Sequence, residues 1–204
     1  MKIVLFALTG FGNKVLEAIL KDGHEVQAIF TRKESGPYPY YQEENIASFA
    51  AREGISVFES FDWQSASKII AKLRPELLLV STFHRIIPEN ILLLAPRGVN
   101  LHPSLLPKYR GPTPIAWVLH NKETVTGVTA HWLVKDADAG EILIQERLAI
   151  EADDDEGKLR YKLSVLAAEV AVKLIKKIQE NKIESYPQIE KEATYFPKFD
   201  RDKY

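Results

Sequence analysis

The chain has 204 residues, enough for one domain with a substantial hydrophobic core, and its 46% hydrophobic and 27% charged residues are ordinary for a soluble globular protein. The formal net charge is −1, so no basic surplus would attract nucleic acid or an anionic membrane surface. The lack of cysteine excludes disulfides, thiolate metal sites and a cysteine nucleophile, and it is compatible with a cytoplasmic location.

The first half of the chain alternates apolar runs with amphipathic helical patterns. Residues 2–8 are a continuous apolar run, too short for a signal peptide or a membrane span, which predicts a buried parallel strand. Further strands are predicted at residues 26–31, 56–58, 77–81 and 98–102, and helices at residues 46–52, 65–73 and 89–94. This alternation predicts right-handed βαβ units and an α/β fold with a mostly parallel, doubly wound, Rossmann-like sheet.

A turn with two glycines, residues 9–12, leads from the first predicted strand into a helical pattern that ends at Gly23. Such a turn can place a phosphate at a helix N-terminus, but the third glycine of the dinucleotide fingerprint is absent. We therefore expect no nicotinamide cofactor and favour a turn that borders a substrate pocket. The loop at residues 32–44 contains Pro37-Tyr38-Pro39-Tyr40-Tyr41, for which surface packing is favoured over an aromatic platform for a base or sugar.

Asn100 and His102 stand two residues apart at the end of a predicted strand, so both side chains face the same way. Pro103 restricts His102 to extended geometry and cannot continue a ladder, which predicts that the strand ends there. An amide that donates a hydrogen bond and an imidazole that exchanges a proton would together suit a site where negative charge develops. Alone, an Asn-x-His pair is more often structural than functional.

The second half of the chain changes pattern. A helix is predicted from Pro114, and strands at residues 125–134 and 142–150 are predicted to pair antiparallel, with Asp136 and Asp138 in their connection. The acidic run 151–156 is interpreted as a solvated turn before a helix rather than a metal site. That helix carries a core-facing stripe of residues 159–178. No two histidines have metal-ligand spacing, so we expect no metal.

Several separated motifs resemble the folate-dependent formyltransferases in order and spacing over most of the chain: Asn100-Leu101-His102, Ser104-Leu105-Leu106-Pro107 and Asp138-Ala139-Gly140. The resemblance implies that 10-formyltetrahydrofolate is the formyl donor and that Asn100, His102 and Asp138 are catalytic. Asp138 is preferred over Asp136 because it stands two residues before Gly140, as in the Asp-x-Gly motif of the family. Whether His102 or Asp138 is the base stays open.

The resemblance also implies the residues that bind the folate, largely through main-chain groups. They are Phe83, His84, Arg85, Ile86, Ile87, Asp136 and Gly140. His131 lies within a predicted strand, and we expect it to have a structural role.

The closest resemblance is to enzymes that formylate nucleotide-linked amino sugars, such as the formyltransferase half of the UDP-aminoarabinose-modifying enzyme. The alternatives are glycinamide ribonucleotide formyltransferases, whose Gly-Ser-Asn phosphate loop the chain lacks, and a 10-formyltetrahydrofolate hydrolase. Methionyl-tRNA formyltransferases carry a further C-terminal domain, so a tRNA acceptor is not expected; a non-catalytic protein is the weakest alternative.

These interpretations assign residues 1–182 to a catalytic domain and 183–204 to a short C-terminal extension that packs on it. The resemblance is compatible with a homodimer and implies no nucleic-acid or membrane partner. The candidate contacts to the acceptor are Thr9, Phe11, Tyr40, Arg110 and Phe196.

Overall fold

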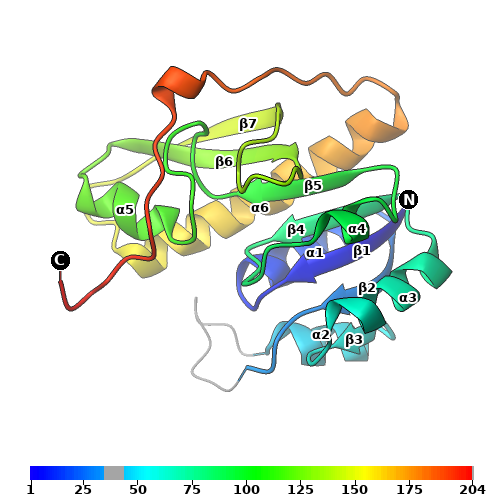
Figure 1. Cartoon of the computed structure of the whole chain (residues 1–204). Helices are drawn as coiled ribbons and strands as arrows, with labels where there is room; N and C mark the ends of the chain where they lie inside the picture. Colours follow the sequence, from blue (N-terminus) through cyan, green and yellow to red (C-terminus); the bar gives the residue numbers. More distant parts are fainter. Residues whose placement is uncertain (35–43, 204) are drawn as a thin grey trace.

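The computed structural model describes residues 1–34 and 44–203, which form an α/β fold around one seven-stranded sheet (Figure 1). The strand order is β3-β2-β1-β4-β5-β6-β7. The strands are β1 (Lys2–Ala7), β2 (Glu25–Phe30), β3 (Ser56–Phe58), β4 (Leu77–Ser81), β5 (Gly98–His102), β6 (Val125–Trp132) and β7 (Ile142–Ala149). The first five strands in this order, from β3 to β5, pair parallel. Strand β6 pairs antiparallel with both β5 and β7, which confirms the predicted mixed sheet.

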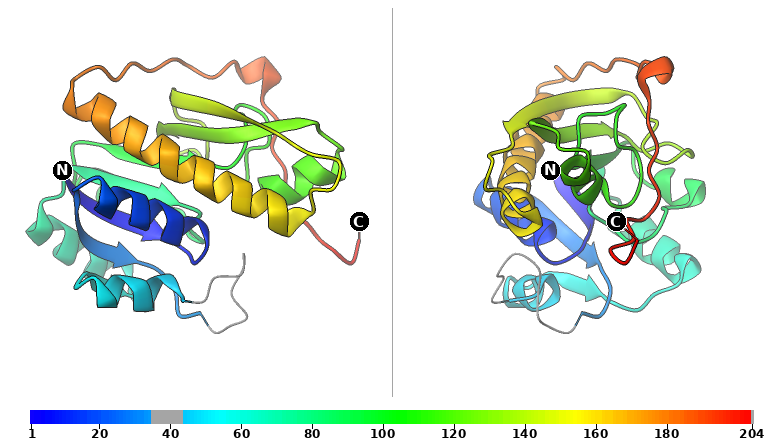
Figure 2. Two further views of the ribbon diagram at one scale, coloured as in Figure 1. Left: turned by 180° about the vertical axis from the view of Figure 1, so that it is seen from behind. Right: turned by 90° about the vertical axis from the view of Figure 1, so that its left-hand side faces the viewer.

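Helices cover both faces of the sheet. They are α1 (Phe11–Lys21), α2 (Ile46–Arg52), α3 (Trp63–Leu73), α4 (Glu89–Leu92), α5 (Pro114–His120) and α6 (Glu156–Gln179). In β1, Ile3 and Leu5 belong to the core shared with α1 and α6, whereas Val4 and Phe6 belong to the core shared with α3 and α4. The view from behind shows α1 and α6 side by side across one face (Figure 2). A run that is apolar on both faces is typical of a strand buried between two helical layers.

Helices α3 and α6 both begin after an aspartate that caps the first turn. Helix α3 begins at Trp63, two residues earlier than predicted, because the Asp62 carboxylate accepts the Ser65 N–H (2.7 Å) and caps the helix. Asp155 caps α6 in the same way through the Lys158 N–H (2.8 Å). The acidic run before α6 therefore supplies a helix cap, as its interpretation as a turn implied.

Residues 183–203, which we call the C-terminal segment, follow α6 and run back over the sheet. Near Tyr186 the segment forms an isolated antiparallel bridge with Ile142 at the start of β7, and near Tyr195 a parallel bridge with Arg110. Figure 1 shows it passing along the β7 side and then down beside α5. None of the helices in residues 1–34 and 44–203 is long and apolar enough to cross a bilayer.

Candidate active site

Strand β5 presents Asn100 and His102 on one face, as their spacing predicted. Val99 and Leu101, the alternate residues, are buried in the core on the α6 side. The neighbouring strand β6 pairs antiparallel with β5 and places His131 opposite Asn100. Two polar side chains of β5 and one of β6 therefore meet on the same part of the sheet.

Asp138 joins this group from the loop of residues 133–141. The loop starts beside the beginning of β5, where the Leu133 N–H donates to the Gly98 carbonyl (2.8 Å), and then turns back toward His102. Asp138 Oδ1 accepts a hydrogen bond from Asn100 Nδ2 (3.2 Å) and lies 3.4 Å from His102 Nδ1. The structure thus brings the three predicted catalytic side chains together.

The proton on His102 is located by its neighbour. His102 Nε2 lies 2.8 Å from the main-chain carbonyl oxygen of Tyr109, and a carbonyl can only accept a hydrogen bond. Nε2 therefore carries a proton and donates it. The neutral ring then has its lone pair on Nδ1, the nitrogen that faces Asp138. Nδ1 is consequently the atom of His102 that can take up a proton.

The electrostatics favour a neutral imidazole beside a charged carboxylate. His102 is almost fully buried, and burial lowers its pKa, although the Asp138 charge and the Tyr109 carbonyl act in the opposite direction. For Asp138, burial raises the pKa, but His102, His131 and the Gly111 N–H (3.0 Å from Oδ2) together hold it well below its usual range. At neutral pH the site therefore contains an ionised Asp138 and a His102 that is ready to accept a proton.

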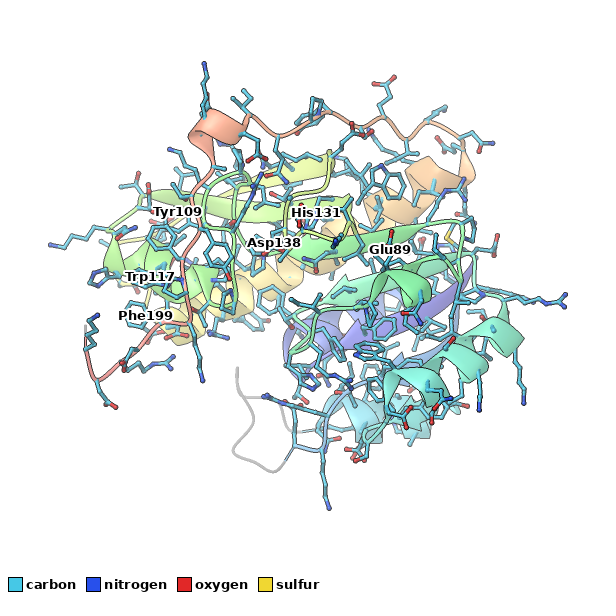
Figure 3. All side chains as sticks on the ribbon, in the orientation of Figure 1. Glu89, Tyr109, Trp117, His131, Asp138 and Phe199 are labelled. Atoms are coloured by element: carbon cyan, nitrogen blue, oxygen red, sulfur yellow. The ribbon has the colours of Figure 1, made fainter. Side chains whose placement is uncertain are left out.

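His131 is the site residue that sequence reasoning placed in a structural role. Its Nδ1 donates to the Trp132 carbonyl (2.9 Å), which leaves Nε2 to accept from Asn100 Nδ2 (3.1 Å). Nε2 also lies 3.6 Å from Asp138 Oδ1, and the labelled pair is close in Figure 3. Both N–H groups of Asn100 thus have partners, so donation to a substrate requires that one of these bonds be exchanged.

Asp136, the competing carboxylate, lies on the outside of the same loop. Its side chain is exposed, and its main-chain carbonyl accepts the Ala139 N–H (3.3 Å). Gly140 is buried, and a Cβ at this position would lie 1.8 Å from the Trp132 carbonyl oxygen. Only glycine permits this close approach, which allows the loop to bring Asp138 inward.

The loop of residues 82–88 after β4, the predicted folate loop, directs several side chains away from solvent. Phe83 packs edge-on against Phe6, and Ile87 is buried in the core on the α3 side. The Arg85 guanidinium lies 4.3 Å from the Trp63 ring centroid. His84 and Ile86 are exposed, and Ile86 retains 73% of its accessible surface. Phe83 and Ile87 therefore contribute to the core, while His84 and Ile86 are open to solvent; that this loop binds the folate stays a prediction.

Of the predicted acceptor contacts, Thr9 and Phe11 are buried. Thr9 donates its hydroxyl to Glu34 and accepts the Ile46 N–H (3.2 Å). The sequence predicts Phe11 in the turn of residues 9–12, but α1 already begins there, and the side chain is 1% exposed in the core. Its side chain has no free surface for a ligand.

Arg110 and Phe196 also have partners within the chain, and Tyr40 lies outside the described residues. Arg110 forms an ion pair with Glu190 (2.7 Å), and Phe196 stacks on Tyr109 with ring centroids 5.2 Å apart. Both side chains therefore contact residues of the chain itself, and their contact to the acceptor stays a prediction. In the part of the chain that the structure describes, no group of three His, Asp or Glu side chains could hold a metal ion.

Comparison with known protein families matches residues 1–175 to the formyl transferase family. The chain belongs to that family. The match covers β1 to most of α6, with Asn100, His102 and Asp138 inside it. This formyltransferase therefore has the family predicted from its motifs, and the predicted donor, 10-formyltetrahydrofolate, is the donor of that family.

Solved structures confirm the fold. A sugar 3N-formyl transferase, WlaRD, with dTDP and 5-N-formyl-THF aligns with a TM-score of 0.77 at 22% identity over 97% of this chain and 70% of its own. An N-formyltransferase from Helicobacter canadensis with folinic acid and dTDP-3-aminofucose gives 0.76 at 22% identity over 97% and 71%. A phosphoribosylglycinamide formyltransferase from Bacillus halodurans gives 0.74 at 22% identity over 89% and 97%. At these identities the acceptor is not decided.

Proposed function

We propose that this formyltransferase moves the formyl group of 10-formyltetrahydrofolate to the primary amine of a nucleotide-linked amino sugar in the cytoplasm. The observation that carries the proposal is the convergence of Asn100, His102 and Asp138 at the end of β5. An amide donor, a neutral imidazole and a carboxylate are the groups that formyl transfer to an amine requires. Open α/β sheets bind their ligands at this edge, beyond the carboxyl ends of the parallel strands.

In the first step the amine nitrogen bonds to the formyl carbon, and the carbonyl oxygen becomes an oxyanion. Asn100 stabilises it once one of its N–H groups exchanges Asp138 or His131 for that oxygen. Catalytic hydrogen bonds of this kind often form only in the substrate complex. A single oxyanion donor contributes about 10²- to 10³-fold in rate.

The attacking nitrogen must then lose a proton, and His102 accepts it on Nδ1. Asp138 is the weaker base because its pKa lies well below the usual range, so its role is to stabilise the imidazolium that forms. As the bond between the formyl carbon and N10 breaks, the proton passes from His102 to N10 of tetrahydrofolate. The products are the formamide and tetrahydrofolate, with atoms and charge balanced.

The acceptor proposal rests on the turn between β1 and α1. There the Thr9 N–H donates to Glu34 (3.1 Å) and the Gly10 N–H donates to Asn13 Oδ1 (3.0 Å). A phosphate monoester bound at this turn needs free N–H groups, and the Glu34 carboxylate would repel it. This arrangement favours an amino sugar over glycinamide ribonucleotide, whose phosphate would have to bind here.

The test is a mass-spectrometric screen with 10-formyltetrahydrofolate against UDP-, dTDP- and GDP-linked amino sugars, glycinamide ribonucleotide and a control without amine. We expect a formyl mass gain on one sugar nucleotide. Gain only on glycinamide ribonucleotide would overturn the acceptor assignment, and formate release without any acceptor would indicate a hydrolase. The matched control is His102→Ala, which should abolish most of the gain while the fold is retained.

A further inference from the structure

The C-terminal segment lies beyond residues 1–175, the part matched to the family, yet it contacts the loop that carries Asp138. Gln188 Nε2 donates to two main-chain carbonyls of that loop, those of Asp138 (2.8 Å) and Gly140 (2.7 Å). One side-chain amide therefore bonds to the backbone on both sides of Ala139. Both N–H groups of Gln188 are used in this way.

The other end of the Gln188 amide bonds to Arg110. Gln188 Oε1 accepts from Arg110 Nε (3.1 Å) and Nη2 (2.8 Å), and the same guanidinium pairs with Glu190 (2.7 Å). The Arg110 side chain is only 11% exposed and its bonds to Gln188 are partly buried, whereas Glu190 is 71% exposed. Gln188 thus connects the Asp138 loop to the loop that contains Arg110.

Residues 109–111 in turn contact the catalytic side chains through their main chain. The Tyr109 carbonyl accepts the His102 Nε2 proton, and the Gly111 N–H donates to Asp138 Oδ2. The positions of both His102 and Asp138 therefore depend on where this short stretch of backbone lies.

The C-terminal segment fixes that stretch on its other side. Thr194 accepts the Tyr109 N–H through its hydroxyl (2.9 Å) and the Arg110 N–H through its carbonyl (2.9 Å). The Phe196 N–H donates back to the Arg110 carbonyl (2.9 Å). A Cβ on Gly111 would lie 2.1 Å from the Phe196 carbonyl oxygen, so the two backbones are in close contact.

Asp138 has a backbone conformation that benefits from such support. Its φ is +56°, in the left-handed region that non-glycine residues rarely occupy. A residue keeps this unfavourable backbone conformation only when several contacts with its surroundings hold it there. The two bonds from Gln188 lie on the carbonyl of this residue and on that of Gly140, two residues later.

We propose that the C-terminal segment positions the catalytic carboxylate, and that Gln188 is the positioning residue that directs Asp138 toward His102. Gln188 touches neither His102 nor the side chain of Asp138 in the described contacts, so it acts only through the Asp138 loop and Arg110. The kinetic part of this inference rests on the proposed function, whereas the structural part does not.

The structural part is tested by NMR titration of the histidine side chains, of which the chain has five. In Gln188→Met, which keeps the side-chain length but cannot donate to the carbonyls, we expect the His102 titration to move to lower pH. The reason is that the Asp138 charge raises the His102 pKa, and a displaced Asp138 no longer does so. The other charged or titratable groups near this pair are His131, Arg110 and Glu190. The variant keeps all three residues, but it removes the two hydrogen bonds that Arg110 donates to Gln188.

The matched control is Gln179→Ala, which removes an exposed amide at the end of α6 and should leave every histidine titration unchanged. The His102 signal is assigned by its loss in His102→Asn, and near-ultraviolet circular dichroism verifies the fold. Gln188→Ala is the second variant should Gln188→Met not fold. An unchanged His102 titration in a folded Gln188 variant overturns the proposal.

The kinetic part uses the sugar nucleotide that the screen identifies. We expect the Gln188 variants to lower kcat about 10- to 100-fold, as a small displacement of a catalytic group does, with KM for both substrates within about twofold. Thr194→Ser, which keeps the hydroxyl that Tyr109 uses, should retain activity, and Thr194→Val should lose part of it. If the unmodified protein formylates no acceptor but the His102 titration still responds to Gln188, the proposed function fails and the positioning role stands.

Discussion

The loop of residues 82–88 and the loop of residues 133–141 follow β4 and β6, the two neighbours of β5 in the sheet. In the first loop, which the resemblance assigns to folate binding through its main chain, Phe83 and Ile87 pack into the core and Arg85 stacks on aromatic rings. In the second, the Asp138 side chain turns inward and the main-chain carbonyls are bonded to Gln188. We expect the first loop to act through its main chain and the second through the Asp138 side chain. Substitutions in the two loops should therefore differ in the size of their effect and in the kinetic constant that they change.

The largest effect is expected from Asp138→Asn. It keeps the shape of the side chain but removes the charge that stabilises the imidazolium, and we expect kcat to fall about 10²- to 10⁴-fold. The His102 pKa should also decrease, because Asp138 raises it in the native protein. NMR titration measures this shift in pKa, and steady-state kinetics with the identified acceptor measures kcat.

The sign of the pH dependence follows from the same pair. In the proposed mechanism neutral His102 is the active form, so activity should be lost as the pH falls through the His102 pKa, which burial places below the usual value of about 6.5. In Asp138→Asn the acid limb of the residual activity should lie at still lower pH. A limb that moves upward would show that Asp138, not His102, accepts the proton.

A smaller effect is expected from Gly140→Ala. Since the added Cβ would lie 1.8 Å from the Trp132 carbonyl oxygen, the backbone must shift, which costs about 1–3 kcal/mol of stability. We expect a lower Tm in calorimetry and, because the Gly140 carbonyl is a partner of Gln188, roughly a tenfold loss in kcat. An exposed alanine substitution such as Gln179→Ala provides the reference; equal Tm values would mean that the loop relaxes at no cost.

The two halves of the site were predictable from sequence to different degrees. Asn100 and His102 could be placed on one face from their spacing alone, and the motif around Gly140 favoured Asp138, the carboxylate that lies beside them in the structure. His131 could not be found in this way, because its place opposite Asn100 depends on the antiparallel register of β5 and β6. A strand register is a long-range property that periodicity does not specify.

The contacts of the C-terminal segment could not be predicted from the sequence for the same reason. Arg110 and Gln188 are 78 residues apart in sequence, and nothing in the composition around either one indicates that they bond. The sequence therefore suggests Arg110 only as a contact to the acceptor, at its diphosphate or base. The two glycines beside Phe11 predict a turn at residues 9–12, whereas the helix starts at Phe11 itself. The fold was more predictable than the side-chain partners because apolar alternation is a local signal.

In the first loop, Arg85→Met is expected to have a modest effect that appears in KM. The guanidinium lies 4.3 Å from the Trp63 ring centroid and 4.9 Å from that of Phe61, and its Nη1 donates to the Phe61 carbonyl (3.1 Å). Cation–π stacking of this kind contributes about 0.5–1 kcal/mol, so a slightly displaced loop should raise KM for 10-formyltetrahydrofolate two- to fivefold. Steady-state kinetics at varied donor concentration measures it; a fall in kcat with unchanged KM would contradict the assignment of this loop to donor binding.

The smallest effect is expected from Asp136→Asn, in the same loop as Asp138. The Asp136 side chain is exposed, and its only described bond uses the main-chain carbonyl, which the substitution leaves intact. Exposed groups of this kind change stability by less than about 0.5 kcal/mol, so kcat, KM and Tm should all remain within about twofold or a few degrees of the native values. Asp136→Asn and Asp138→Asn should be measured side by side, because each removes one carboxylate charge and the two positions are only two residues apart. If Asp136→Asn were the more damaging of the two, the catalytic carboxylate would be Asp136, and the inward turn of Asp138 would have to be explained by packing alone.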